Sequence, residues 1–166
     1  MRVLFVSQYY PPETGAAPLR AFHFARTLAA SGHSVTVVTG MPNHPSGVKP
    51  PAYRRRLAAR EKSDGVLVRR CYTYATPRKT FATRMLNQLS FAFTGVFGGL
   101  ATGPCDVVLV TSPPLFLGVT GWLLALVKGV PFVLDVRDYW PRAAVALGQL
   151  RGRRAIARAE GLERFL

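Results

Sequence analysis

Residues 1–22, MRVLFVSQYYPPETGAAPLRAF, combine a hydrophobic strand, a loop and the start of a helix. The apolar run at 2–7 predicts a buried strand, and apolar residues at helical spacing predict a helix over 18–30. This order is typical of α/β folds, in which the loop after the strand often holds a phosphate. The usual G-x-G-x-x-G pattern is absent, because the loop contains a single glycine, Gly15.

The same alternation of short apolar strands and helices continues along the chain. Strands are predicted at 34–39, 65–74, 106–110 and 131–136, helices at 80–102, at 115–128 and from about residue 150, and a long loop at 40–60. This order implies parallel strands joined by right-handed crossovers, so we predict an α/β fold with a Rossmann-like doubly wound parallel sheet and helices on both faces. Ligands bind outside the carboxyl ends of such strands. The loops QYYPPETG, GMPNHPSG, SPP and RDYWP are therefore expected to converge on one rim.

The charge balance is strongly basic. The 166 residues are enough for one domain with a core, and 22 Lys and Arg against 8 Asp and Glu give a net charge of +14. This favours an anionic partner, with a plain solvated surface as the alternative. Because the sequence has no helix-turn-helix, zinc-binding or RNA-recognition pattern, we expect no nucleic acid but a membrane surface or a phosphorylated ligand.

Several segments resemble the amino-terminal half of family-4 glycosyltransferases. They are residues 1–47, which include GHSVTVVTG (32–40), then TSPPLF (111–116), PFVLDVRDYWP (131–141), ALGQL (146–150) and LERFL (162–166). In this order, and with RDYWP, the pattern is fairly specific. It is most similar to the O-antigen and capsule enzymes of the N-acetyl-fucosamine transferase type.

The resemblance implies one half of a GT-B fold, in which two Rossmann-like domains face each other across a cleft. Residues 1–166 would be the acceptor-side domain, cut short in its last helix, and a carboxy-terminal donor domain would be supplied in cis or in trans. The implied reaction is a retaining transfer of a hexosyl-type sugar from a nucleotide sugar, expected to be UDP-linked, without a metal ion or cofactor. The isolated chain is then expected to be inactive.

The implied partners follow from this reaction. They are the nucleotide sugar, a polyprenyl-linked or glycan acceptor and an anionic membrane surface. The implied location is cytoplasmic, peripheral at the inner face of the cell membrane, in polysaccharide or lipopolysaccharide synthesis.

The first loop would form the floor of the cleft. Glu13 or Thr14 is expected to bond sugar hydroxyls, Gly15 to bring backbone amides near an anion, and Arg20 to contact a phosphate. The alternative is that prolines stiffen the loop while Thr14 caps the helix. The sequence departs from the family at Ala16, where many members have a second glycine, and its methyl group limits a close approach of the donor phosphate.

Two further loops supply candidate site residues. Asn43 and His44 lie in a proline-bounded loop, where His44 is expected to bond an acceptor phosphate or hydroxyl, or to be an ordinary surface histidine. Asp138 is the catalytic candidate, because a carboxylate just past a buried strand can orient the acceptor hydroxyl or accept its proton. Arg137 beside it is a substrate-binding candidate or the ion-pair partner of Asp138. A further alternative is that Asp138 is a carboxylate at a helix N-terminus. Trp140 would stack on a sugar ring or fill the core.

The leading hypothesis is therefore the acceptor-binding half of a retaining glycosyltransferase. The alternative is a non-catalytic half-domain that binds a glycolipid or a partner and acts with a separate donor subunit. A dinucleotide oxidoreductase is disfavoured, because G-x-G-x-x-G is missing and Thr39-Gly40 stands where a ribose-binding acid is expected.

Overall fold

The structure, a computed structural model, describes residues 1–138, 141–146, 148, 150 and 152–166. Its sheet has six strands in the order β3-β4-β2-β1-β5-β6. The strands are β1 (Arg2–Ser7), β2 (Ser34–Gly40), β3 (Ala58–Ser63), β4 (Val66–Cys71), β5 (Val107–Ser112) and β6 (Phe132–Val136). The helices are α1 (Ala16–Ala30), the 3-10 helix η1 (Pro51–Tyr53), α2 (Phe81–Leu100), α3 (Phe116–Lys128), α4 (Arg142–Ala146) and α5 (Arg153–Phe165). Only β3 and β4 pair antiparallel among these strands. The predicted doubly wound α/β fold is confirmed.

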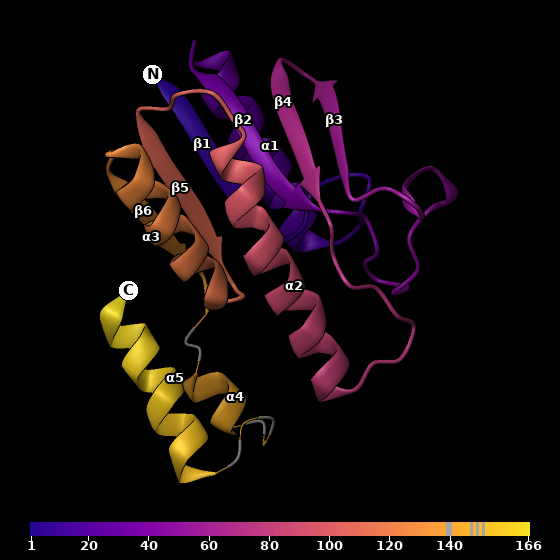
Figure 1. The fold of residues 1–166 in the computed structure, drawn as a ribbon, viewed down its shortest axis with the longest axis vertical. Coiled ribbons are helices and arrows are strands. Elements are labelled where there is room, and N and C mark those ends of the chain that lie inside the picture. Colours follow the sequence, from indigo (N-terminus) through magenta and orange to yellow (C-terminus); the bar gives the residue numbers. More distant parts are fainter. Residues whose placement is uncertain (139–140, 147, 149, 151) are drawn as a thin grey trace.

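Helices cover both faces of the sheet (Figure 1). Helix α1 lies behind the sheet in this view, and α2 and α3 lie side by side in front of it. Because successive side chains of a strand point to opposite faces, Val3 and Phe5 of β1 pack in the cluster that contains α1. Leu4 and Val6 pack in the cluster that contains α2 and α3. The central strand β1 is therefore buried on both sides.

Small residues let α2 approach the sheet closely. A Cβ added to Gly98 would lie 2.2 Å from the Sγ of Cys71, so the helix backbone rests directly over the end of β4. Cys71 is buried as a consequence, whereas Cys105, which lies between α2 and β5, is only half-buried, and both thiols are free.

The prediction of a long loop over residues 40–60 was wrong for its last residues. Its last residues form the edge strand β3, which pairs with β4 as a hairpin. The connection is Asp64-Gly65, with φ angles of 51° and 78°, the left-handed conformation of a two-residue hairpin turn. The Asp-Gly pair was the available signal, but β3 itself, AAREKS, is charged and lacks the alternation typical of a strand.

The start of α1 also differs slightly from the prediction. The helix begins at Ala16 rather than at residue 18, and its N-cap is Gly15, with φ 122° and no side-chain cap. The exposed Thr14 is therefore not the helix cap, which the alternative interpretation of the first loop required.

Candidate functional site

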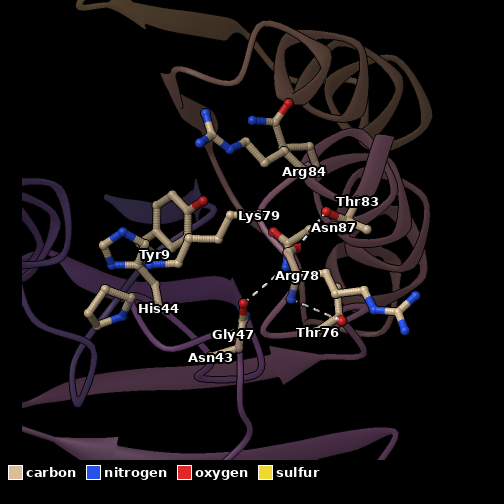
Figure 2. A pocket seen from close by; sticks show the side chains of 12 residues that line it. Tyr9, Asn43, His44, Gly47, Thr76, Arg78, Lys79, Thr83, Arg84 and Asn87 are labelled. Carbon is tan, nitrogen blue, oxygen red and sulfur yellow. Dashed lines mark hydrogen bonds between the residues drawn. The ribbon is translucent and has the colours of Figure 1, made fainter. Parts of the chain in front are cut away.

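A pocket of about 380 Å³ lies at the carboxyl edge of the sheet. Its walls come from the segments that follow β1, β2 and β4 and from the first turns of α2 (Figure 2). The lining residues are Tyr9, Asn43, His44, Pro45, Gly47, Thr76, Arg78, Lys79, Thr83, Arg84, Asn87 and Gln88. We call this cavity the rim pocket. It unites segments far apart in the sequence because parallel strands end at the same edge.

Glu13 ties the first loop to the loop after β2. Its Oε1 accepts hydrogen bonds from the backbone N–H groups of Asn43 and His44, both at 2.9 Å, and its Oε2 accepts one from Tyr10 N–H at 3.3 Å. The side chain is buried, and burial raises the pKa of Glu13 above its usual value, while the three N–H groups and Arg70 act in the opposite direction. The carboxylate therefore holds the His44 loop in place, and its contact with a sugar hydroxyl stays a prediction.

Asn43 belongs to a chain of amide side chains beneath the rim pocket. Its Oδ1 accepts a hydrogen bond from Asn87 Nδ2 at 3.0 Å, and its own Nδ2 donates to Met41 O at 2.8 Å. Asn87 Nδ2 also donates to Tyr74 O, and Asn87 Oδ1 accepts from Gln8 Nε2 at 2.9 Å. Asn87 thereby joins α2 to the loops after β1, β2 and β4.

His44 and Gly15 lie at the mouth of this site. The His44 ring is exposed and packs at 5.0 Å from the ring of Tyr9, and Figure 2 shows both rings facing Thr83 and Asn87 across the pocket. Gly15 is close by, since a Cβ added to it would lie 4.0 Å from Cε1 of His44. The predicted meeting of the first two loops is therefore seen in the structure.

The charged side chains that line the rim pocket are positive. Arg78, Lys79 and Arg84 line it, and no carboxylate of the described residues does. None of the three cations has an ion-pair partner in the described part of the chain. Thr80 caps α2 by accepting a hydrogen bond from Thr83 N–H, and the positive end of the helix dipole adds the same sign. The pocket therefore suits an anion.

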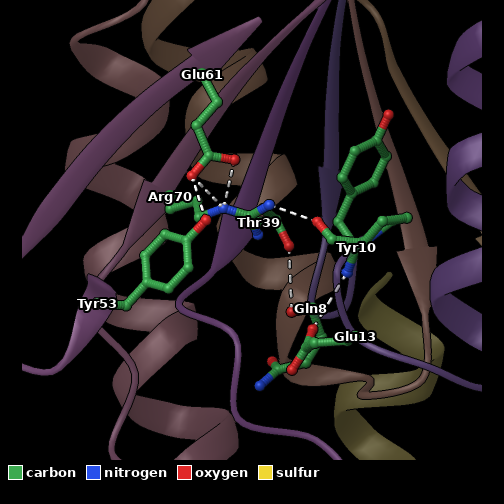
Figure 3. A network of polar contacts seen from close by, with 8 residues as sticks. Gln8, Tyr10, Glu13, Thr39, Tyr53, Glu61 and Arg70 are labelled. Atoms are coloured by element: carbon green, nitrogen blue, oxygen red, sulfur yellow. Dashed lines mark hydrogen bonds and ion pairs between the residues drawn. The ribbon is translucent and has the colours of Figure 1, made fainter. Parts of the chain in front are cut away.

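A buried arginine supports the first loop from below (Figure 3). Arg70 of β4 is only 2% exposed, and its Nε lies 2.9 Å from both carboxylate oxygens of Glu61 on β3. Its Nη2 donates to the backbone oxygen of Pro11, and its guanidinium lies over the ring of Tyr53, which itself donates to Glu61 at 2.7 Å. Arg70 thus joins the first loop, η1 and the edge strand β3.

Asp138 lies in a different pocket. This cavity, of about 320 Å³, is lined by Ser112, Leu115, Phe132, Leu134, Val136, Asp138, Glu163 and Leu166. It shares no lining residue with the rim pocket. Asp138 is exposed there, facing the same space as Glu163 of α5. The loops after β5 and β6 are joined by Arg137, whose N–H and Nε donate to Ser112 O at 3.2 and 3.0 Å. Trp140 lies outside the described residues.

The predicted site residues therefore form two groups at the carboxyl edge. Asn43 and His44 line the rim pocket, with Gly15 beside it, whereas Asp138 lines the second pocket. Arg20 joins neither group, because its Nη2 forms an ion pair with Asp135 of β6 at 2.9 Å. Its contact with a phosphate stays a prediction, as does the sugar contact of Thr14.

Sequence reasoning missed the contribution of α2. Arg84 and Asn87 reach the rim pocket from a helix that is otherwise apolar. The signal that was present is the polar pair Asn87-Gln88 inside this apolar helix, at spacings of three and four residues from Arg84.

Among the residues that the structure describes, no group of three His, Cys, Asp or Glu side chains is placed to hold a metal ion. None of the described helices combines the length and the hydrophobicity that a membrane crossing requires.

Comparison with known proteins identifies the chain's family. Residues 15–165 match the family model described as glycosyl transferase 4-like domain. The chain is also 29% identical over 150 residues to the putative colanic acid biosynthesis glycosyl transferase WcaI of Escherichia coli (strain K12). The match covers 89% of this chain but only 37% of that relative, so the chain spans well under half of its length. As its family match spans nearly all of its residues, the chain belongs to the glycosyl transferase 4-like family.

Proposed function

We propose that this chain is the acceptor-binding half of a retaining, nucleotide-sugar-dependent glycosyltransferase that acts in polysaccharide or glycolipid synthesis. The observation that carries the proposal is the gathering of cationic and polar side chains at the carboxyl edge of a doubly wound sheet, in a chain of this family. The relative's role in colanic acid biosynthesis, as its name states it, supports a polysaccharide product.

Under this proposal, sugar transfer requires a second domain that closes the cleft. The donor half, which binds the nucleotide sugar, faces the carboxyl edge and closes the cleft. The isolated 166 residues are then inactive, because the donor half supplies the other side of the cleft. The leaving phosphate of the donor takes the acceptor's proton in a retaining transfer, so Asp138 orients the acceptor hydroxyl rather than acting as a strong base.

Asp138→Asn is the first test of this role. In the full-length protein we expect the turnover at saturating acceptor to fall by about tenfold or more, because the amide cannot hold a hydroxyl proton as the carboxylate does. The rate of label transfer from a radioactive nucleotide sugar to a lipid-linked acceptor measures it. The melting temperature should not change, because Asp138 is exposed.

The matched control is Asp64→Asn, the same change at the hairpin turn far from either pocket, where asparagine also tolerates the left-handed conformation. Retained turnover in Asp138→Asn would remove the positioning role. Absence of any sugar transfer by the full-length wild-type protein would remove the proposed function.

The membrane part of the proposal rests on the outer face of α2. Apolar residues at spacings of three and four form a stripe along this helix, on the side away from the buried Phe91, Gly95 and Gly98. The stripe consists of Leu86, Leu89, Phe93, Phe97 and Leu100, which are between 40% and 68% exposed. An apolar stripe on a protein with a net charge of +14 is the pattern of a helix that lies on an anionic bilayer surface.

Phe93→Ser tests this contact. Losing one phenyl ring from the stripe should weaken binding to phosphatidylglycerol-containing vesicles by about fivefold or more, since partial burial of such a ring contributes about 1 kcal/mol. Sedimentation with vesicles measures the effect. Leu19→Ser, a similarly exposed position on α1 across the sheet, is the control. Equal binding of the two variants would argue against a membrane contact through α2.

A further inference from the structure

We propose that the rim pocket is a diphosphate-binding site. The proposal deepens the proposed function, on which it rests for the identity of the ligand's source.

The positive charges that line the rim pocket are not balanced by carboxylates of the described residues. Arg78, Lys79 and Arg84 line one cavity, and the described residues offer none of them a carboxylate partner. Arg2 and Arg20, by contrast, form ion pairs with Asp106 and Asp135. Three like charges that line one cavity repel one another, and a bound anion relieves this repulsion.

Hydrogen bonds hold the backbone of Arg78 in place. Thr76 Oγ1 accepts a hydrogen bond from Arg78 N–H at 3.4 Å, and Thr83 Oγ1 donates to Arg78 O at 2.6 Å. The loop from β2 presses on the same segment, since Gly47 has a φ of 75° and a Cβ added to it would lie 2.1 Å from Thr76 O. The conformational entropy of this loop is therefore already lost in the ligand-free protein, and binding does not have to order it.

The volume and the lining of the rim pocket fit a diphosphate group. A cavity of about 380 Å³ falls within the roughly 300–1,000 Å³ of small-molecule pockets. Two guanidinium groups and one ammonium group match several anionic oxygens, and guanidinium binds phosphate oxygens in pairs. The Tyr9 ring packs against His44, so the pocket provides charge for phosphates rather than an open platform for a base.

Two sources of this group fit the proposed function. One is the diphosphate that links an acceptor to its lipid carrier, and the other is the nucleoside diphosphate part of the donor. The position at the amino end of α2, whose outer face carries the apolar stripe, favours the lipid-linked source.

The test is calorimetric titration of the full-length protein with inorganic pyrophosphate at low ionic strength. We expect saturable binding that Arg78→Gln/Arg84→Gln weakens by about thirtyfold or more, because two charge-assisted contacts are lost. The control is Arg26→Gln/Arg153→Gln, which removes the same charge from exposed positions on α1 and α5. The control should bind almost as the wild type does.

Arg84→Lys controls for misfolding of the variants. Lysine keeps the positive charge but cannot donate the pair of hydrogen bonds that a guanidinium gives to phosphate oxygens. We therefore expect a smaller loss of affinity than in the double variant. Equal weakening of the double variant and its control, or no pyrophosphate binding by the wild type, would overturn the proposal. Tighter binding of farnesyl diphosphate than of uridine diphosphate would assign the site to a lipid-linked ligand, and the reverse order to the donor; either order supports a diphosphate site.

The two proposals fail separately. Pyrophosphate binding without sugar transfer would remove the proposed function and leave the anion site standing. Sugar transfer with unchanged pyrophosphate affinity in Arg78→Gln/Arg84→Gln would remove the anion site alone.

Discussion

Arg70→Met is expected to lower the free energy of unfolding by about 3 kcal/mol, the largest effect that we predict for a single substitution in this chain. Methionine fills much of the volume but leaves Glu61 without its cation and the backbone oxygen of Pro11 without its donor. Removing one member of a buried ion pair costs about 3–5 kcal/mol in general. The lower end applies because Glu61 is 32% exposed and can be partly rehydrated.

Urea unfolding followed by tryptophan fluorescence measures the effect of Arg70→Met. The matched control is Arg55→Met, the same change at an exposed arginine of the neighbouring loop, which should stay within about 0.5 kcal/mol of the wild type. Adding Glu61→Met to Arg70→Met should recover part of the loss, because no unpaired carboxylate remains. A loss no greater than that of the control would contradict the anchoring role of Arg70.

Glu13→Ala is expected to lower the free energy of unfolding by about 2–3 kcal/mol. Three backbone N–H groups, of Tyr10, Asn43 and His44, lose their acceptor, and each buried donor without a partner costs about 1–3 kcal/mol. Relief of the buried negative charge offsets part of that cost. The exposed Glu160→Ala serves as the control, with an expected change below about 0.5 kcal/mol.

The pH dependence of Glu13→Gln tests the same arrangement. Burial raises the pKa of Glu13 above its ordinary value of 4.5, so the folded chain holds this proton more tightly than the unfolded chain does. The stabilisation of the folded state by this tighter proton binding is fully present below pH 4.5. It is lost as the pH rises through the raised pKa of Glu13. The difference in unfolding free energy between wild type and Glu13→Gln should therefore decrease from pH 4.5 toward neutrality. A difference that grows over this range would disprove the burial argument.

The order of the parallel strands could be predicted from the sequence because it depends on local patterns. Runs such as DVVLV are apolar throughout, as strands buried on both faces must be, and helical spacing separates them. The hairpin partner β3 could not be recognised in the same way, since AAREKS is a charged edge strand whose stability comes from pairing with β4.

The rim pocket could be predicted from the sequence only where strand ends position its lining. Asn43 and His44 follow β2 directly, and the expected rim contains them. Nothing in VRRC distinguishes the buried Arg70 from its neighbour Arg69, because the acceptor of Arg70, Pro11, lies 59 residues away in the sequence. Glu13 accepts hydrogen bonds from N–H groups of a loop that the sequence does not place beside it. Its expected contact with a sugar stays a prediction.

The packing of Gly98 on Cys71 has a practical consequence for spectroscopy. Burial raises the pKa of the Cys71 thiol to about 11, so almost no reactive thiolate forms there at neutral pH. Of the two cysteines in the chain, Cys105 is the more accessible, and it stands at the amino edge of the sheet. A maleimide fluorophore or spin label attached to Cys105 would therefore sit at the edge opposite the rim pocket and leave both pockets unoccupied.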